Sequence, residues 1–330
     1  MAGHRQNFEV NSKFIRTVSA LHTSEDAALP LLADFFGTLR EHRLLDFGRD
    51  VARPLAHTSA HALRHKIESA FVYELVVQRN FPPPANADEN WPWPLKICAL
   101  GTFTVTIGGK PLAFDGKAQK KPLEMLQLVV AHQDSATAIG PKVQWLIDEL
   151  WSNAEAKDPQ GAFDTTLHRL RKLIGIDGAI ILADGRLSFN TALTWCDVNA
   201  FETLAGSHHP LQQTRALAYY SGALLHATSY VWAAAPRERL AVLYIATVEA
   251  CAGRSEASGD HRAALGWYAR ALEQDNLVEA FYRGLMRCHL ALGDPSEALR
   301  SYRRLKELLS IVLGTTPTAE TETLRARVAG

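Results

Sequence analysis

The sequence contains no apolar run that approaches the roughly 20 residues of a membrane-spanning helix. Its first residues, Met1 to Arg5, lack the charged and then apolar layout of a secretory signal peptide. These two absences argue against a membrane partner and predict a cytoplasmic location. The 330 residues, 47% of them apolar and 21% charged, have the composition of two or three ordinary globular domains.

Metal and redox motifs are also missing. The four cysteines are Cys98, Cys196, Cys251 and Cys288, and no two of them are spaced as CxxC, so neither a zinc site nor a redox motif is supported. His57, His61 and His65 recur every four residues and would line one face of a helix, a spacing at which paired histidines can hold zinc. No nearby carboxylate completes an HExxH motif, so we expect an exposed helix that carries histidines and no metal.

The sequence also lacks catalytic signatures and carries no net charge. The sequence has no serine elbow, no GxxxxGK[ST] phosphate loop and no paired-carboxylate signature, so we expect no enzyme, no catalytic residues and no cofactor. The 35 basic and 35 acidic residues cancel, which argues against a protein that coats nucleic acid without specificity. A specific binder with a local basic patch remains compatible with this balance.

Two boundaries divide the chain. Residues 81–90 are polar and rich in proline, which blocks the continuation of helices and sheets, so residues 81–94 are predicted to form a linker. A softer break at 205–210 separates residues 95–204 from residues 211–330. Residues 1–80 are predicted to be helical, because Leu31, Leu32, Phe35, Phe36 and Leu39 follow helical spacing, and they look like the last few helices of something larger.

Residues 95–204 combine strand and helix patterns in a fixed order. Apolar residues alternate with polar ones over 95–107, and Gly108-Gly109 turns the chain, which predicts a short antiparallel sheet with a hairpin. Helices are predicted after Pro122, over 143–151, and from Asp158-Pro159 to Gly175, since aspartate caps a helix and proline fits its first turn. A strand, an Asp184-Gly185 turn and a second strand follow. This order is typical of a winged helix, whose third helix enters the major groove of DNA.

The third helix is amphipathic in a way that suits this role. On a helical wheel Phe163, Leu167, Leu170 and Ile174 form one apolar stripe that would face the core. The opposite face and its flank offer side chains for bases and phosphates. Lys117, Lys120 and Lys121 could add backbone contacts, and Arg186 could reach a phosphate from the wing. The predicted DNA-binding residues are Thr165, His168, Arg169, Arg171, Lys172, Arg186, Lys120 and Lys121.

Two observations oppose this interpretation. A helix with basic residues on one face is usually only a solvated helix. Residues 95–200 also hold 11 basic and 11 acidic side chains, so the electrostatic part of any DNA affinity should be modest, and tight binding would need dimers or tandem sites.

The C-terminal region contains an internal repeat. The segment 259–265 (GDHRAAL) is echoed by 293–299 (GDPSEAL), Tyr268 by Tyr302 and Arg270 by Arg304, always at an offset of 34 residues. This offset is the tetratricopeptide period, in which helix-turn-helix units stack on their neighbours. The expected fold class is therefore mainly α with small β-sheets: a winged helix-turn-helix followed by a tetratricopeptide-like domain.

Residues 95–330 resemble bacterial transcriptional activator domain regulators with an OmpR-like winged helix, as in the streptomycete antibiotic regulatory proteins. The resembling motifs are Leu100-Gly101-Thr102-Phe103, Leu150-Trp151, residues 167–173 (LHRLRKL), Trp195-Cys196-Asp197-Val198, Trp232 before Arg237-Glu238-Arg239-Leu240, and Leu313-Gly314. Residues 91–94 (WPWP) and 117–124 are similar to a subgroup of large maltose-activator-type, ATP-dependent regulators. In that subgroup an ATPase and a helical sensor array precede the output domains. The resemblance implies that residues 1–80 are the end of such a sensor array, whereas the ATPase has no counterpart in this sequence.

The resemblance implies a sequence-specific activator. Its winged helix would bind double-stranded promoter DNA as a homodimer and the complex would contact RNA polymerase, while the helical domain mediates dimerisation or control. A small-molecule effector and occlusion of the recognition helix by residues 1–90 are further hypotheses that rest on domain order alone. The rival interpretation is an interaction scaffold or ligand sensor that does not bind DNA, since tetratricopeptide arrays bind peptides.

Overall fold

A computed structural model describes residues 2–113, 119–151 and 157–329. The chain divides into two compact units, which are treated separately below. The first comprises Met1–Ile97, Thr104–Val129 and Ala138–Cys196, and the second comprises Cys98–Phe103, Val130–Thr137 and Asp197–Gly330. The expected boundaries at 81–94 and 205–210 stay predictions. Among the described residues, no helix is long and apolar enough to cross a bilayer.

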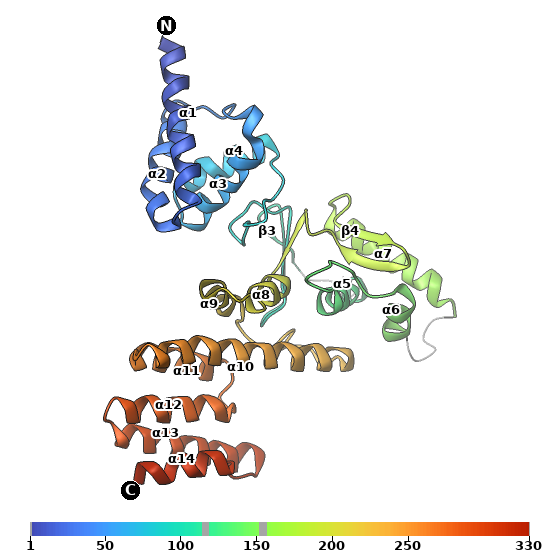
Figure 1. Cartoon of the computed structure of the whole chain (residues 1–330). Coiled ribbons are helices and arrows are strands. Elements are labelled where there is room, and N and C mark those ends of the chain that lie inside the picture. Colours follow the sequence, from blue (N-terminus) through green and yellow to red (C-terminus); the bar gives the residue numbers. More distant parts are fainter. Residues whose placement is uncertain (1, 114–118, 152–156, 330) are drawn as a thin grey trace. The chain divides into compact units, whose positions relative to one another are not determined.

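The N-terminal helices of the first unit lie together as a bundle (Figure 1). They are α1 (Ala2–Leu21), α2 (Glu25–Glu41), the short 3-10 helix η1 (Arg49–Val51), α3 (Ala52–Arg64) and α4 (Ser69–Arg79). The face predicted for α2 is confirmed, since Leu32, Phe35, Phe36 and Leu39 are fully buried. The ring of Phe35 lies 5.3 Å from that of Phe14 on α1, so this face joins the two helices.

The β-structure of the first unit consists of two small sheets. The strands are β1 (Leu95–Cys98), β2 (Thr104–Ile107), β3 (Lys110–Pro111), β4 (Ile180–Ala183), β5 (Arg186–Phe189) and β6 (Thr194–Cys196). The hairpin predicted at Gly108-Gly109 is confirmed, because β2 and β3 are antiparallel and both glycines have positive φ. The four-stranded sheet has the order β3-β2-β1-β6, and β4 and β5 form the wing.

One expectation about the first sheet is wrong. The alternation over 95–107 predicted a purely antiparallel sheet, whereas β1 pairs with β6 in parallel, with Leu95 beside Thr194 and Ile97 beside Cys196. A period of two residues indicates a strand but carries no information on its partner. The partner here follows the wing in the sequence, and only the folded chain brings it alongside β1.

The helical part of the winged helix follows the expected pattern. Its helices are α5 (Lys120–His132), α6 (Val143–Leu150) and α7 (Pro159–Ile174). The Asp158 side chain accepts a hydrogen bond from the Gly161 amide at 3.0 Å, and Gly175 ends α7 in the left-handed conformation. The apolar stripe of Phe163, Leu167, Leu170 and Ile174 is buried, as the helical wheel predicts.

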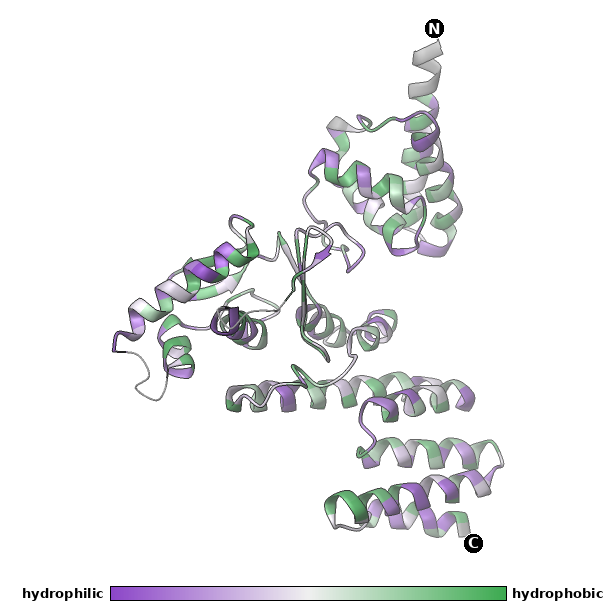
Figure 2. Ribbon diagram, turned by 180° about the vertical axis from the view of Figure 1, so that it is seen from behind, coloured by the Kyte–Doolittle hydropathy of each residue, from purple (hydrophilic) through white to green (hydrophobic). Residues whose placement is uncertain are grey.

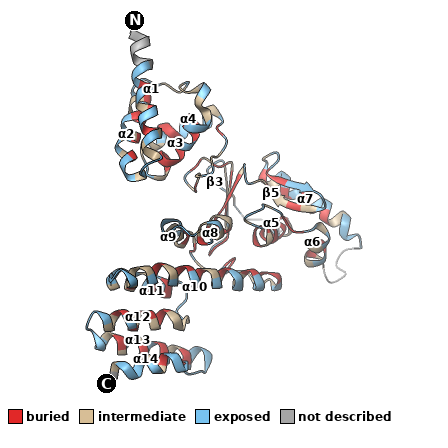
Figure 3. Ribbon diagram, viewed as in Figure 1, coloured by how far each residue is buried: buried red, intermediate tan, exposed pale blue. Residues whose placement is uncertain are grey.

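The second unit is built almost entirely from helices. They are α8 (Asp197–Ala205), α9 (Pro210–Tyr219), the 3-10 turn η3 (Val231–Ala233), α10 (Ala234–Ala257), α11 (His261–Gln274), α12 (Glu279–Ala291), α13 (Pro295–Leu308), the π-helical turn η4 (Leu309–Leu313) and α14 (Ala319–Ala329). Hydrophobic and hydrophilic residues alternate along α10 to α14 (Figure 2), and buried residues alternate with exposed ones (Figure 3). This amphipathic pattern lets each helix pack on the next.

The internal repeat predicted from the sequence is confirmed in the capping geometry. Gly259 and Gly293 have φ of 79° and 77°, and the aspartate after each glycine caps the following helix. The carboxylate of Asp260 accepts from Ala263 N at 2.9 Å, and that of Asp294 accepts from Glu297 N at 3.1 Å. The same turn therefore occurs 34 residues apart, as the sequence offset requires.

Close packing between the repeats depends on one glycine. Gly284 on α12 faces the ring of Tyr268 on α11, and a Cβ atom added at Gly284 would lie 2.3 Å from the Tyr268 Cζ. Tyr268 is fully buried and its hydroxyl donates to Glu256 Oε1 at 2.7 Å. Because the ring is held at both ends, it has little freedom to move away.

We therefore predict that Gly284→Ala lowers the free energy of unfolding by about 1–3 kcal/mol, because overpacking forces the Tyr268 ring or the helix backbone to shift. The matched control is Gly266→Ala on α11, where an added Cβ meets nothing within 4 Å. This second change should stabilise by up to about 1 kcal/mol, since alanine favours helix more than glycine does. Urea unfolding followed by circular dichroism measures both, and equal midpoints for the two variants would contradict the packing argument.

Candidate nucleic-acid interface

The exposed face of α7 carries the residues predicted to read DNA. Thr165, His168, Arg169, Arg171 and Lys172 are all exposed, whereas the opposite stripe of the helix is buried (Figure 3). Asp164 is exposed at the edge of this face, and its carboxylate accepts a hydrogen bond from Gln160 at 3.2 Å. The helical period therefore separates a core-facing stripe from a polar, mostly basic face.

Two grooves beside α7 bring part of the predicted set together. A groove of about 570 Å³ is lined by Lys121, Trp151, Thr165 and Arg169, among others. A second groove, of about 540 Å³, is lined by Gln119, Pro122, Arg169, Lys172 and Leu173. Arg169 borders both, so cations from the start of α5 and from α7 lie around one surface. Lys120 is exposed next to Lys121, and Lys117 lies outside the described residues.

Three of the predicted side chains are already bonded within the protein. The ammonium group of Lys121 donates to the Leu150 carbonyl at 2.8 Å and lies 3.2 Å from Glu124. The guanidinium groups of Arg171 and Arg186 donate to the carbonyls of Ile180 at 3.2 Å and Gly140 at 2.9 Å. Arg186 is half-buried at the start of β5. These contacts restrict how far the three side chains can reach.

Arg169 and Lys172 differ from these three residues. Within the part of the chain that the structure describes, neither side chain makes a hydrogen bond or an ion pair, and both are exposed. A cation without an internal partner retains its full charge for an external anion. The sequence identified both residues but could not separate them from the bonded cations.

The wing is attached to a segment that the sequence did not indicate. The Val143 amide donates to the Gly185 carbonyl at 2.8 Å, and the Leu187 amide donates to the Pro141 carbonyl at 3.1 Å. A Cβ atom at Gly140 would overlap the Leu187 carbonyl, so this approach requires glycine. Lys142 pairs with Arg186 in an isolated bridge and is exposed, which adds a cation beside the wing.

In the second unit, a buried carboxylate fixes the start of α8. Asp197 is 4% exposed, and its two carboxylate oxygens accept hydrogen bonds from the amides of Ala99 and Leu100 at 2.8–2.9 Å. Burial raises its pKa from 3.8 to about 6, although the amides of Leu100 and Ala99 lower it in part. Asp197 belongs to the Trp-Cys-Asp-Val motif, so one motif residue has a structural role.

Arginines of a second motif hold neighbouring segments. The guanidinium of Arg237 donates to the carbonyl oxygens of Leu224, Leu225 and Thr228, each at 2.7 Å. Leu224 in turn forms an isolated bridge with Leu100. Arg237 therefore stabilises the loop that packs beside the segment held by Asp197.

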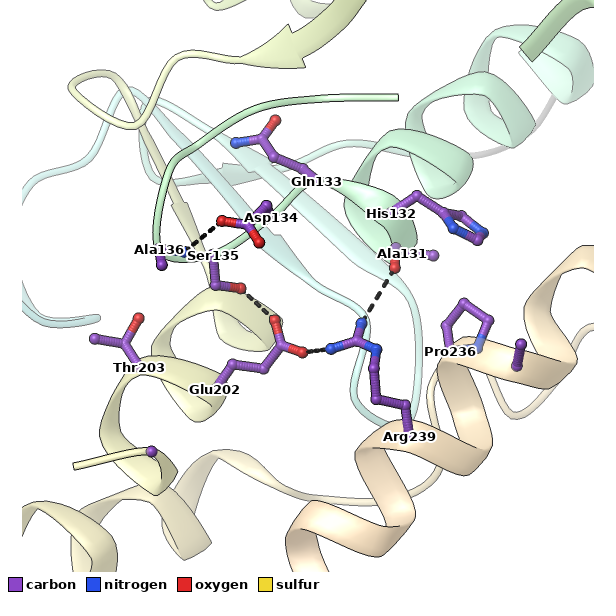
Figure 4. Close-up of a pocket in the computed structure, with 12 residues that line it drawn as sticks. Ala131, His132, Gln133, Asp134, Ser135, Ala136, Glu202, Thr203, Pro236 and Arg239 are labelled. Atoms are coloured by element: carbon purple, nitrogen blue, oxygen red, sulfur yellow. Dashed lines mark hydrogen bonds and ion pairs between the residues drawn. The ribbon is translucent and has the colours of Figure 1, made fainter. Parts of the chain in front are cut away.

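Arg239 closes a further set of contacts around a cavity of about 800 Å³ (Figure 4). It forms an ion pair with Glu202 of α8, and Glu202 also accepts a hydrogen bond from the Ser135 hydroxyl. Asp134 accepts hydrogen bonds from the backbone amides of Ala136 and Thr137. Arg239 and Glu202 satisfy each other, and Asp134 is satisfied within its own turn, so the cavity wall serves to join α8, α10 and residues 131–137.

Of the three histidines considered as alternative metal ligands, His57 and His61 lie on α3 and His65 is the residue that follows its end. The Glu25 carboxylate oxygen Oε1 accepts from His61 Nδ1 at 2.6 Å, from His65 Nε2 at 3.0 Å and from Arg64 at 3.1 Å. Burial alone would raise the pKa of Glu25, but the hydrogen bonds from His65 and His61 and the nearby charges outweigh it and lower the pKa to about 2. An ionised carboxylate only accepts, so His61 Nδ1 and His65 Nε2 carry protons and are occupied by Glu25.

His61 departs from one expectation. The sequence predicted an exposed histidine-bearing helix, whereas His61 is 8% exposed and its burial lowers its pKa. The reason is the Glu25 carboxylate of α2, which draws the ring inward. Among the described residues, no group of three or more histidine, cysteine or acidic side chains is arranged to hold a metal ion.

The C-terminal, mostly helical part of the chain is similar to a known protein family. Residues 196–329, from the end of β6 through α14, match the bacterial transcriptional activator domain family. The resemblance proposed from the sequence is therefore confirmed for these residues, which are similar to a bacterial transcriptional activator domain. No curated protein sequence matches the chain.

Among solved structures, the chain is similar to EmbR of Mycobacterium tuberculosis, determined in complex with a low-affinity phosphopeptide. The two are 21% identical with a TM-score of 0.54, and the likeness covers 72% of this chain and 65% of the EmbR chain. At this identity the likeness concerns the fold. The expected fold class, a winged helix with a helical repeat region, is confirmed.

The pKa of Asp197 predicts how stability changes with pH. A buried acid whose pKa is raised in the folded state binds its proton more tightly there, so stability falls as pH rises from about 4 to about 6. We expect the wild type to lose up to about 3 kcal/mol over this window relative to Asp197→Asn, which cannot ionise. Denaturant unfolding of both proteins at matched pH measures the difference, and parallel stability curves would show that Asp197 keeps an ordinary pKa.

Proposed function

We propose that the chain is a sequence-specific, DNA-binding transcription activator whose α7 enters the major groove. The observation that carries this proposal is the pair of unbonded cations, Arg169 and Lys172, on the exposed face of a helix whose opposite face is buried. The bacterial transcriptional activator domain over residues 196–329 supports the assignment to transcription. Promoter DNA as the partner implies action in the cytoplasm.

The roles of the two cations follow from their chemistry. An arginine presents a planar fork of donors that matches the O6 and N7 atoms of guanine, so Arg169 is proposed to read a base. A lysine is a point charge, so Lys172 is proposed to contact a phosphate. Thr165 and His168 on the same face would make smaller contacts. Lys120 and Lys142 are exposed cations that would contact phosphates beside α5 and the wing.

Charge balance limits the affinity of a single copy. The acidic and basic side chains of residues 95–200 are equal in number, 11 of each, so long-range attraction to DNA is weak. We propose that binding as a homodimer to repeated half-sites makes up the difference, because two linked contacts multiply their affinities. Contact with RNA polymerase is assigned to the helical domain, which leaves α7 available to the DNA.

Fluorescence anisotropy of the full chain tests the proposal. A pool of labelled duplexes of about 30 base pairs is measured at low and moderate salt, so that duplexes which survive the salt increase identify the operator. On that operator, Arg169→Ala should cost about 1–3 kcal/mol and relax specificity at one position. Lys172→Ala should weaken binding to all duplexes similarly and reduce the salt slope by about 1.

The matched control is Lys110→Ala. Lys110 is an exposed cation on β3, away from α7 in the fold of the first unit, and its removal should leave specificity unchanged. If Arg169→Ala and Lys172→Ala bind as the wild type does at matched salt, then α7 does not read DNA. The helical scaffold would then become the better interpretation of the chain.

A further inference from the structure

A small cavity lies within the helical domain, between α9, α10 and α11. Its volume is about 270 Å³, and the residues that line it include Tyr220, Tyr244, Trp267, Arg270 and Gln274. Pockets for drug-sized ligands span about 300–1,000 Å³, so this cavity suits a molecule of about one aromatic ring with a short substituent. It is lined by other residues than the 800 Å³ cavity of Figure 4, where Arg239 is paired with Glu202 and Asp134 accepts hydrogen bonds from backbone amides.

One wall of the cavity is a rigid aromatic surface. The rings of Tyr220 and Tyr244 stack at 4.1 Å with an angle of 14° between their planes. Phe201 packs behind Tyr220 at 5.2 Å, and Phe281 packs edge-on against Tyr244 at 6.5 Å. Because both tyrosines are at least 93% buried by these neighbours, the wall is already formed before any ligand arrives.

The polar ends of these two tyrosines are unused. Within the described ranges of the chain, neither the Tyr220 nor the Tyr244 hydroxyl makes a hydrogen bond, and neither oxygen is fully buried, so both can donate to solvent or to a ligand. Burial, together with the negative charge of Asp275 and, for Tyr244, also that of Glu273, raises the pKa of each phenol to about 12, so both keep their protons and remain donors at neutral pH. The Arg270 charge acts in the opposite sense on Tyr244 and offsets these acids at the cavity.

Arg270 supplies the positive charge of the cavity. Its guanidinium lies over the Trp267 ring, 5.7 Å from the centroid, which holds it at the cavity. It makes no ion pair or hydrogen bond with any residue that the structure describes, and it is the one charged side chain in the cavity lining. Asp275 lies outside the lining, and its carboxylate accepts a hydrogen bond from the Leu277 amide at 3.0 Å.

We propose that this cavity is a binding site for a small aromatic carboxylate. The Arg270 guanidinium binds the carboxylate, the Tyr220 and Tyr244 hydroxyls donate to it, and the stacked rings contact the aromatic body of the ligand. A free cation, unused donors and a preformed flat wall are the complementary surfaces of a planar anion. The inference goes beyond the proposed function and does not depend on DNA binding.

The position of the site connects it to the rest of the unit. Ser221 also lines the cavity, and its hydroxyl donates to the Leu100 carbonyl. The amide of that same Leu100 is bound by Asp197. A ligand that contacts Tyr220 and Ser221 therefore lies one residue away, through Leu100, from the start of α8.

Calorimetric titration and saturation-transfer NMR of the full chain test the site. The probes are benzoate and indole-3-acetate, with benzamide and indole-3-acetamide as neutral counterparts of the same shape and benzylamine as a cation. We expect both acids to bind and their amides to bind at least about tenfold more weakly, because charge-assisted hydrogen bonds are the stronger ones. Benzylamine should show no binding at the same concentrations.

Two variants and one control assign the binding to these residues. Arg270→Gln should reduce acid binding to the level of the amides, and Tyr244→Phe, which keeps the ring, should weaken it several-fold. Arg304→Gln is the matched control, since Arg304 occupies the equivalent position 34 residues later and does not line the cavity. A thermal melt checks that each variant is folded.

Three outcomes would overturn the proposal. They are unchanged acid binding by Arg270→Gln, preference for benzylamine over benzoate, and the absence of binding by both acids at millimolar concentration. Loss of binding in Arg270→Gln but not in Arg304→Gln supports it. Because the readout is ligand binding alone, the result is independent of whether the chain also binds DNA.

Discussion

A buried carboxylate that binds two backbone amides is the interaction on which the second unit depends most. Asp197 is the first residue of α8, and it holds the amides of Ala99 and Leu100, 98 and 97 residues earlier in the chain. Without it these amides would be buried and unpaired, at a cost of about 1–3 kcal/mol each. Asp197 therefore holds residues 99–100, which follow β1, against the start of α8.

Other contacts extend outward from this clamp. Leu100 bridges Leu224, and the carbonyl of Leu224 accepts from Arg237. Arg239, two residues further along α10, pairs with Glu202 of α8. Backbone hydrogen bonds and arginine side chains thus connect residues 98–103, 224–228 and α10 into one network. Each partner in this network would lose hydrogen bonds if the segments moved apart, so the network favours one arrangement of these segments.

Charge at the α7 surface is used selectively. The first unit employs Lys121, Arg171 and Arg186 to bind its own carbonyl oxygens, and it leaves Arg169 and Lys172 unbonded. The same division recurs in the second unit, where Arg237 and Arg239 bind backbone or acid groups while Arg270 is free beside an aromatic wall. The difference between a bonded and an unbonded cation is what separates structural arginines from candidate binding residues in this chain.

The sequence by itself determined the elements with local causes. The caps at Asp158, Asp260 and Asp294, the buried stripe of α7, the hairpin at Gly108-Gly109 and the repeat of 34 residues all depend on side chains within a few positions of one another. Because helix period and capping act over one or two turns, they can be read from composition and spacing. The exposed face of α7 was predictable for the same reason.

Only the tertiary structure decided which distant groups meet. The parallel pairing of β1 with β6, the Asp197 clamp, the inward turn of His61 toward Glu25 and the wall formed by Tyr220 and Tyr244 join residues far apart in the sequence. Spacing within the chain carries no information on such contacts. They form because burial in a close-packed interior favours partners for polar groups and surfaces for rings, and the fold as a whole decides which distant residues supply them.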